Sequence, residues 1–111
     1  TWPLRAPSSE QPLDLLTCGP LTFDPIDDGA FRCYAIARQC AAAGGTACAI
    51  MNAANEEAVW AFLRGETGFN GIHRTVEAAL ERVAVKYQPS LADILEADRL
   101  ARAAARAVLT R

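Results

Sequence analysis

Apolar and polar residues follow two different patterns on either side of residue 29. From residue 30 onward, apolar residues recur at intervals of three and four, which is the period of an amphipathic helix. Residues 1–29 show no such period and hold five of the six prolines. Because proline fixes φ and lacks an amide donor, this composition predicts an extended linker arm. Within the arm, residues 20–23 (Pro-Leu-Thr-Phe) predict one short strand, and the chain encodes no sheet with which it could pair.

The helical pattern divides into four segments, which run over about residues 30–43, 46–64, 70–85 and from Ser90 onward. The segment 46–64 is predicted as either one helix or two. Since each segment has one apolar face and the connections are short, we expect a small antiparallel helical bundle. The predicted fold is therefore mainly α, with a helical domain over residues 30–111 and the extended arm before it.

Residue types that favour helix ends support these boundaries. The glycine pair at 44–45 predicts a left-handed stop after the first helix. Thr46 is the candidate N-cap of the second helix, and Asn55 is a candidate N-cap if that segment divides in two. Ser90, followed three residues later by Asp93, predicts a capping box at the start of the last helix.

The composition is that of one globular domain, with 51% hydrophobic and 22% charged residues in 111. A formal charge of −2 and scattered basic residues argue against nucleic acid as a partner. No apolar run reaches the roughly 20 residues of a membrane-spanning helix, and no signal-peptide layout opens the chain, so we expect no membrane partner and a cytoplasmic location. Because the chain lacks an initiator methionine, we expect it to be part of a longer polypeptide.

The four cysteines, Cys18, Cys33, Cys40 and Cys48, include no Cys-x-x-Cys pair. Cys33 and Cys40 are seven residues apart on one predicted helix, about 10 Å along its axis at ~1.5 Å per residue, which is too far for a mutual disulfide. Four reduced thiols acting as small apolar side chains are the favoured interpretation. A single disulfide and metal or redox chemistry are the alternatives.

The sequence predicts no catalytic, cofactor-binding or metal-binding residue in this chain. It has no Gly-x-Gly-x-x-Gly after a strand, no phosphate-binding loop and no His-x-x-x-His pair. The one histidine, His73, flanks the apolar stripe of its helix without a neighbouring acid or thiol. We therefore expect a solvent-facing side chain with no catalytic role.

The most unusual block is Asn52-Ala53-Ala54-Asn55-Glu56, in which two asparagines lie on adjacent helical turns among apolar residues. One interpretation is a ligand or subunit contact, because buried amides require partners. The other is capping and turn fixation between two half-helices, which is favoured because asparagine is a preferred cap.

Asp98 interrupts the apolar stripe of the last helix, and a carboxylate there must be exposed or paired. Arg102, four residues on, is its predicted partner, and we expect Asp98 also to accept hydrogen bonds from the segment 52–55. A lone acid provides no general acid/base machinery, so catalytic use of Asp98 is disfavoured. The stripe is predicted to comprise Leu91, Ile94, Leu95, Ala101, Ala105, Val108 and Leu109.

Several blocks occur in an order and spacing typical of one enzyme family: Trp2-Pro3-x-Arg5, Pro12-Leu13-Asp14-Leu15, Leu21-Thr22-Phe23, Gly44-Gly45-Thr46, Asn52-Ala53-Ala54-Asn55-Glu56-x-Ala58-Val59-x-Ala61-Phe62-Leu63, Phe69-x-x-Ile72 and Ala97-Asp98-x-x-Ala101-Arg102. Through these residues the chain resembles the C-terminal part of 1-deoxy-D-xylulose 5-phosphate reductoisomerase. The asparagine block is the most specific of them. Arg32 and Cys48 depart from the family, which has proline at both positions.

The resemblance implies an oxidoreductase of the non-mevalonate isoprenoid pathway. Such an enzyme rearranges 1-deoxy-D-xylulose 5-phosphate and reduces the product with NADPH to 2-C-methyl-D-erythritol 4-phosphate, using a divalent metal (Mg or Mn). The family's nucleotide, metal and phosphate ligands precede the part seen here, so no catalytic residue is carried over. The chain is then expected to be a linker arm and a C-terminal domain that packs beside the catalytic domain, helps shape the cleft of a homodimeric enzyme, and is inactive alone.

Two other functions are compatible with parts of the sequence. The first is a free-standing helical protein-interaction module without catalysis, whose arm would fold back onto the bundle. The arm of an enzyme fragment would instead be disordered, swapped or packed against another copy, because its apolar residues, Trp2 included, need a missing sheet. The second is a small independent enzyme using Asp98 and His73, which is disfavoured because nothing in the sequence places the two together.

Overall fold

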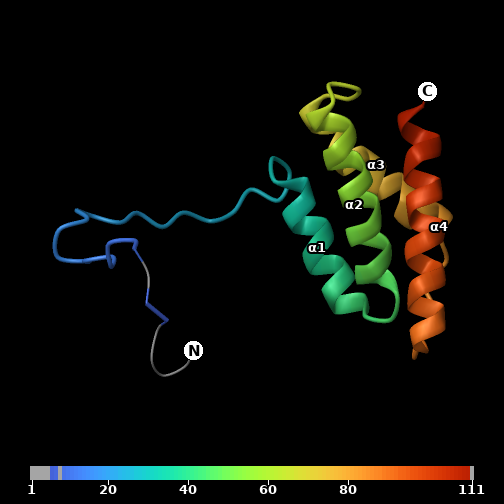
Figure 1. The fold of residues 1–111 in the computed structure, drawn as a ribbon, viewed down its shortest axis with the longest axis horizontal. Coiled ribbons are helices and arrows are strands. Elements are labelled where there is room, and N and C mark those ends of the chain that lie inside the picture. Colours follow the sequence, from blue (N-terminus) through green and yellow to red (C-terminus); the bar gives the residue numbers. More distant parts are fainter. Residues whose placement is uncertain (1–5, 8, 111) are drawn as a thin grey trace.

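A computed structural model describes residues 6–7 and 9–110 and shows a helical bundle (Figure 1). The predicted mainly α fold is confirmed. Consecutive helices run in opposite directions (Figure 1). The four helices are α1 (Arg32–Ala43), α2 (Ala47–Leu63), α3 (Phe69–Arg82) and α4 (Leu91–Leu109).

Helix α2 occupies the centre of the bundle and contacts each of the other three helices. Helix α3 lies beside it and also contacts all the others, whereas α1 and α4 lie on opposite sides and do not touch each other in the described structure. None of these helices is long and apolar enough to cross a membrane.

The core depends on small side chains on α2. Ala53, Ala54, Ala58 and Ala61 are fully buried, and so is the larger Ile50. Because a methyl side chain adds little to the helix radius, alanine lets neighbouring backbones approach closely while filling the interior. Residues from the other helices complete the two core clusters; they include Ile36, Cys40, Val76, Ala79, Val83, Ala97, Ala101 and Ala105.

Helix α3 turns one apolar face to the core, where Ile72, Val76 and Ala79 are buried. The stripe predicted for α4 is wrong at its start. Ala97, Ala101 and Ala105 face the core, whereas the leucines at the beginning of α4 are exposed. The start of α4 projects beyond the start of α2, so these leucines have no neighbouring helix to pack against (Figure 1).

Helix α2 is one continuous helix, so the predicted alternative of two helices, with Asn55 as a cap, is wrong. At the start of α4 the predicted capping box is confirmed, because Asp93 N donates to Ser90 Oγ and Ser90 N donates to Asp93 Oδ2. Thr46 is the N-cap residue of α2, as predicted, but its side chain makes no cap hydrogen bond.

Thr46 instead joins two loops at one end of the bundle. Its Oγ1 accepts a hydrogen bond of 3.0 Å from Lys86 N, and its own amide donates 3.1 Å to Lys86 O. The preceding residue, Gly45, has a φ of +58° and lies against the Lys86 carbonyl. The left-handed glycine stop predicted after α1 therefore also lets the α1–α2 and α3–α4 loops meet.

The arm extends away from the bundle, and its described residues contain neither helix nor strand (Figure 1). The strand predicted over residues 20–23 is not confirmed, because no partner strand is present to complete its hydrogen bonds. Apolar side chains along the arm face solvent, with Leu16 95% and Phe23 88% exposed. Trp2 lies outside the described residues.

Replacing Gly45 with alanine tests the contact between the two loops. A side chain at this positive φ is strained, and its Cβ would collide with the Lys86 carbonyl, so Gly45→Ala is expected to lower the free energy of unfolding by about 2 kcal/mol or more. Gly65→Ala is the matched control, because Gly65 also has a positive φ but a Cβ there meets nothing within 4 Å. Urea unfolding measures both; equal losses would contradict the proposed loop contact.

Candidate functional site

The asparagine block lies in the middle of α2, and its residues point in different directions. Ala53 and Ala54 are buried, Asn52 and Glu56 are exposed, and Asn55 is half-buried. Because the helix is continuous from Ala47, neither asparagine caps a helix end. The favoured interpretation of this block, capping between two half-helices, is therefore wrong. The interpretation as a contact residue stays open for Asn55.

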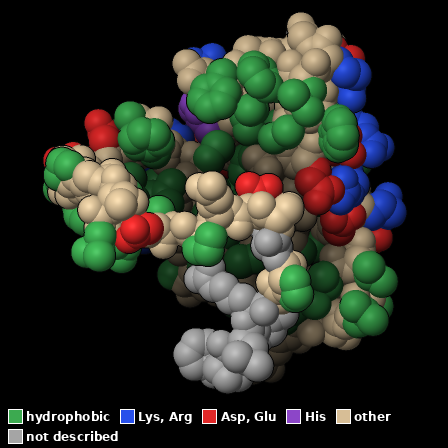
Figure 2. Space-filling view, turned by 60° about the vertical axis from the view of Figure 1, so that its left-hand side comes forward, with side chains coloured by type: hydrophobic (Ala, Val, Ile, Leu, Met, Phe, Trp, Pro, Cys, Tyr) green, Lys and Arg blue, Asp and Glu red, His purple; other side chains and the backbone are tan. Residues whose placement is uncertain are grey.

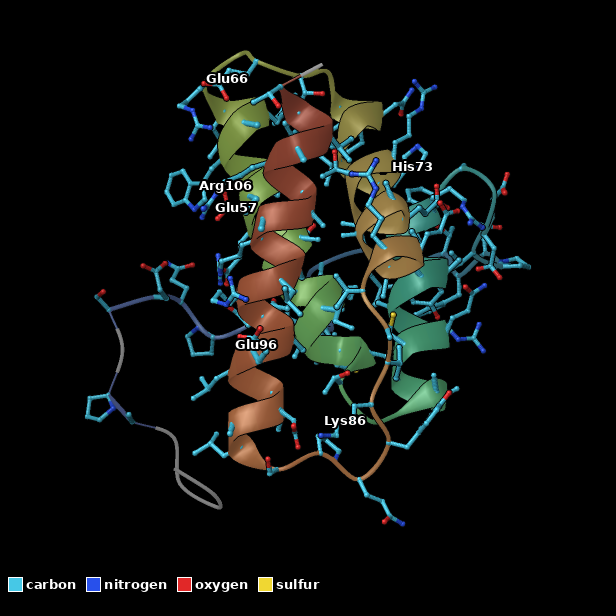
Figure 3. All side chains as sticks on the ribbon, turned by 90° about the vertical axis from the view of Figure 1, so that its right-hand side faces the viewer. Glu57, Glu66, His73, Lys86, Glu96 and Arg106 are labelled. Carbon is cyan, nitrogen blue, oxygen red and sulfur yellow. The ribbon has the colours of Figure 1, made fainter. Side chains whose placement is uncertain are left out.

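On one side of α2, Arg102 of α4 gathers acidic residues from both helices. Its Nη2 donates 2.7 Å to Glu56 Oε2, and its Nε donates 2.9 Å to Asp98 Oδ2. The neighbouring Arg106 donates from Nε and Nη2 to the two carboxylate oxygens of Glu57, at 2.9 and 2.7 Å. Figure 3 shows Glu57 and Arg106 facing each other from α2 and α4. We call these five residues the Arg102 network.

The pairing of Asp98 with Arg102, expected from their spacing, is present. The direct hydrogen bonds predicted from segment 52–55 to Asp98 are absent among the described residues, so that prediction is wrong. The guanidinium of Arg102 lies between the two elements and bonds Asp98 on its own helix and Glu56 on α2. Asn52 Nδ2 donates 3.1 Å to Glu56, so the asparagine reaches the network through that glutamate.

Hydrogen bonds within the Arg102 network favour the charged forms of Glu56, Glu57 and Arg102. Hydrogen bonds from Arg106 lower the pKa of Glu57, and a hydrogen bond from Arg102 lowers the pKa of Glu56. Hydrogen bonds to Asp98 and Glu56 raise the pKa of Arg102. A general acid or base needs a pKa close to the working pH, and these shifts move each group away from it. The arrangement suits a fixed link between α2 and α4.

A second polar cluster lies between α1 and α3. Arg32 Nε donates 3.0 Å to Glu77 Oε1, and His73 Nδ1 lies 3.5 Å from the other oxygen of that carboxylate. The prediction of a solvent-facing His73 is wrong, because its side chain is only 24% exposed and its Nδ1 is buried beside Glu77. His73 contacts Glu77 whereas Asp98 contacts Arg102, so the two residues belong to separate clusters, which argues against an independent enzyme using both.

An open groove of about 380 Å³ lies beside this second cluster, between the starts of α1 and α3 and the middle of α2. Aromatic side chains form its rim, and those of Phe69 and Phe62 meet edge to face with ring centroids 5.8 Å apart. Asn55 of α2 and His73 of α3 contribute polar side chains to its wall. The full lining is Ala30, Phe31, Arg32, Cys33, Tyr34, Asn55, Val59, Phe69, Asn70, Ile72 and His73. We call it the α1–α3 groove.

All four cysteines are free thiols in the structure. Cys40 packs in the core as a small apolar side chain, whereas Cys18, Cys33 and Cys48 are exposed. Burial and the nearby charge of Glu77 raise the pKa of Cys33, which makes its reactive thiolate scarcer. Across residues 6–7 and 9–110, no group of three His, Cys, Asp or Glu side chains is placed to hold a metal ion.

Sequence reasoning identified Asp98, Arg102 and Glu56 but missed Glu57 and Arg106. The available signal was the spacing of four residues between Arg102 and Arg106, which places both on one face of α4. The spacing of the arginines on α4 does not show how α4 packs against α2, so it cannot predict which acidic residues of α2 they contact. Taken together, the fold and its polar contacts define a small helical domain whose charged residues join one helix to another.

Comparison with known proteins gives the family. The family model of the DXP reductoisomerase C-terminal domain matches residues 1–104, and the chain belongs to this family. It is 46% identical over 110 residues to the 1-deoxy-D-xylulose 5-phosphate reductoisomerase of Pseudomonas paraeruginosa, covering 99% of this chain and 28% of that relative. The reductoisomerases of Ruminiclostridium cellulolyticum and Geobacillus kaustophilus are 42% and 43% identical, with 98% of this chain and 29% of each relative covered. The chain thus spans less than a third of these relatives.

Removing the guanidinium of Arg102 tests the network as the link between α2 and α4. Arg102 is 29% exposed and bonds both Glu56 and Asp98, so Arg102→Ala leaves these two carboxylates without their guanidinium donor. We expect the free energy of unfolding to fall by about 1–2 kcal/mol, measured by chemical denaturation. Arg99→Ala is the control, because Arg99 pairs with Glu96 on the same helix and is 66% exposed. A midpoint shift in the control as large as that of Arg102→Ala would count against the network.

Proposed function

We propose that the polypeptide containing this chain isomerises 1-deoxy-D-xylulose 5-phosphate and reduces the product to 2-C-methyl-D-erythritol 4-phosphate with NADPH and a divalent metal. The observation that carries this proposal is the match of nearly the whole chain to the C-terminal domain of reductoisomerases, at 42–46% identity to the relatives above. Within the enzyme, this chain supports the active-site cleft and is inactive alone.

No group of side chains among the described residues is placed to hold a metal ion, and the sequence contains no Gly-x-Gly-x-x-Gly motif for a nucleotide. A divalent ion of this kind is bound by carboxylates together with water and substrate oxygens. The carboxylates of Glu56, Glu57 and Asp98 are instead taken up by arginines. We therefore assign both groups to the part of the enzyme that precedes this chain, and derive no catalytic step from the residues seen here.

The arm supports the role of this chain as one part of a longer enzyme. Apolar side chains from Leu13 to Phe23 are exposed to solvent, which is unfavourable unless another surface covers them. An interaction module would fold its arm back, and the described arm does not do so. We propose that residues 1–29 are a linker, that residues 30–111 are the domain, and that Leu21-Thr22-Phe23 pairs with a strand of the preceding part.

The remaining features of the proposal concern the whole enzyme. The partner of this chain is the remainder of its own polypeptide, comprising the nucleotide-binding and catalytic domains. We propose that the enzyme is a homodimer whose interface lies in that remainder, and that it acts in the cytoplasm.

The proposal is tested by turnover of 1-deoxy-D-xylulose 5-phosphate with NADPH and manganese, followed as loss of NADPH absorbance. The full-length polypeptide is expected to consume NADPH only when substrate is present, and residues 1–111 alone are expected to consume none. An inactive but folded full-length protein would contradict the proposed activity. Activity of residues 1–111 alone would contradict the structural role.

A further inference from the structure

We propose that the α1–α3 groove is the surface on which the bundle docks against the preceding part of its own polypeptide. This inference rests on the proposed function, because it takes the rest of the reductoisomerase as the occupant. It adds the face of the bundle, the side chains that make the contact and the chemistry of the segment they receive.

The groove exposes apolar surface that the bundle leaves uncovered. Phe31 at the start of α1 and Phe69 at the start of α3 are both largely exposed, and Val59 of α2 lies between them in the lining. Single exposed apolar residues are ordinary, but a groove of about 380 Å³ rimmed by aromatic rings is typical of a binding surface. Figure 2 shows hydrophobic side chains on either side of the histidine, and most of the Lys and Arg side chains in this view lie along one edge.

Two polar side chains, Asn55 and His73, lie in the wall of the groove. The half-buried amide of Asn55 makes no hydrogen bond to another described residue, whereas the Nδ1 of His73 lies 3.5 Å from Glu77 Oε2. The Asn55 amide is therefore available to donate to, and accept from, a segment that enters the groove. On the opposite side of α2, by contrast, Glu56 and Glu57 are fully engaged by arginines.

The path of the chain indicates which partner is close at hand. Because the chain matches the C-terminal domain and spans under a third of its relatives, the rest of the enzyme precedes Thr1. The arm enters the bundle at this groove, since Ala30 and Phe31 belong to its lining. Ile26 of the arm adjoins Phe31 and Tyr34 in a smaller pocket of about 220 Å³. A domain tethered through the arm is therefore held near this face at high effective concentration.

The groove also defines the chemistry of the docked segment. Its aromatic and aliphatic rim suits an apolar side chain, and the Asn55 amide can both donate to and accept from a main-chain peptide group. The carboxylate of Glu77 is already bound by Arg32, so a basic side chain gains no free acid there. We infer an uncharged segment that presents one or more apolar side chains with hydrogen-bonding backbone beside them.

Photo-cross-linking in the full-length enzyme tests this docking. The photoreactive analogue p-benzoylphenylalanine replaces Phe69 in the groove or, as a matched control, Leu95 on α4. Both positions carry apolar side chains that are exposed in this chain, 73% for Phe69 and 62% for Leu95, and α4 contributes nothing to the groove. Mass spectrometry of the digested monomer band identifies the peptides joined to each position.

The expected result is an intramolecular cross-link from position 69 to residues that precede Thr1, and its loss when the analogue stands at position 95. Cross-links from position 69 only to a second copy, only within the bundle, or at the level of position 95 would overturn the proposal. Turnover of 1-deoxy-D-xylulose 5-phosphate is measured separately on the full-length enzyme without the photoreactive analogue. An active enzyme without the cross-link refutes the docking surface alone, whereas an inactive folded enzyme refutes the proposed function.

Discussion

Helix α2 lies between the other three helices, and the close approach of their backbones depends on the alanines that it buries. Ala53, Ala54, Ala58 and Ala61 have no exposed surface, so any larger side chain at these positions would push a neighbouring helix outward. This constraint restricts the polar residues of α2 to two edges. Glu56 and Glu57 lie along the edge facing α4, and Asn55 lies along the edge facing α1 and α3.

The two edges differ in how far their polar groups are satisfied. On the α4 side, two arginines bond three carboxylates, so the charges are paired and further link two helices that already share a core. Isolated exposed ion pairs contribute little to stability, but partly buried groups that share donors depend on one another. On the other side, Asn55 lines an apolar groove and its amide makes no hydrogen bond to a described residue. The edge facing α4 therefore links helices within the bundle, whereas the edge facing α1 and α3 presents a groove that can receive another segment.

Local features of the sequence predicted most of the fold. Helix periods, the glycine stop at 44–45 and the capping box at Ser90 each depend on residues within one or two turns, and the structure contains all of them. The resemblance, carried above all by the asparagine block, predicted the family that the comparisons confirm. These features can be predicted from the sequence because they depend on neighbouring residues and not on contacts between helices.

The errors share a different physical cause, since each involves a contact between helices. The asparagines were expected as caps because that is their local preference, but packing against three helices keeps α2 continuous. Asp98 was expected to meet α2 directly, and the longer side chain of Arg102 makes that connection instead. The leucines at the start of α4 fit the helical period, but no neighbour lies beneath them. The α1–α3 groove is formed by three separate segments, so it cannot be predicted from the sequence of any one of them.

The central claim is that α2 uses its asparagine block for two contacts, one that closes the bundle and one that joins it to the rest of the enzyme. A crystal structure of the full-length polypeptide tests this most directly. The account predicts that Glu56 still bonds Arg102, while a segment preceding Thr1 fills the α1–α3 groove and hydrogen-bonds the Asn55 amide. A groove left open to solvent, with the remainder of the enzyme packed on another face of the bundle, would contradict it.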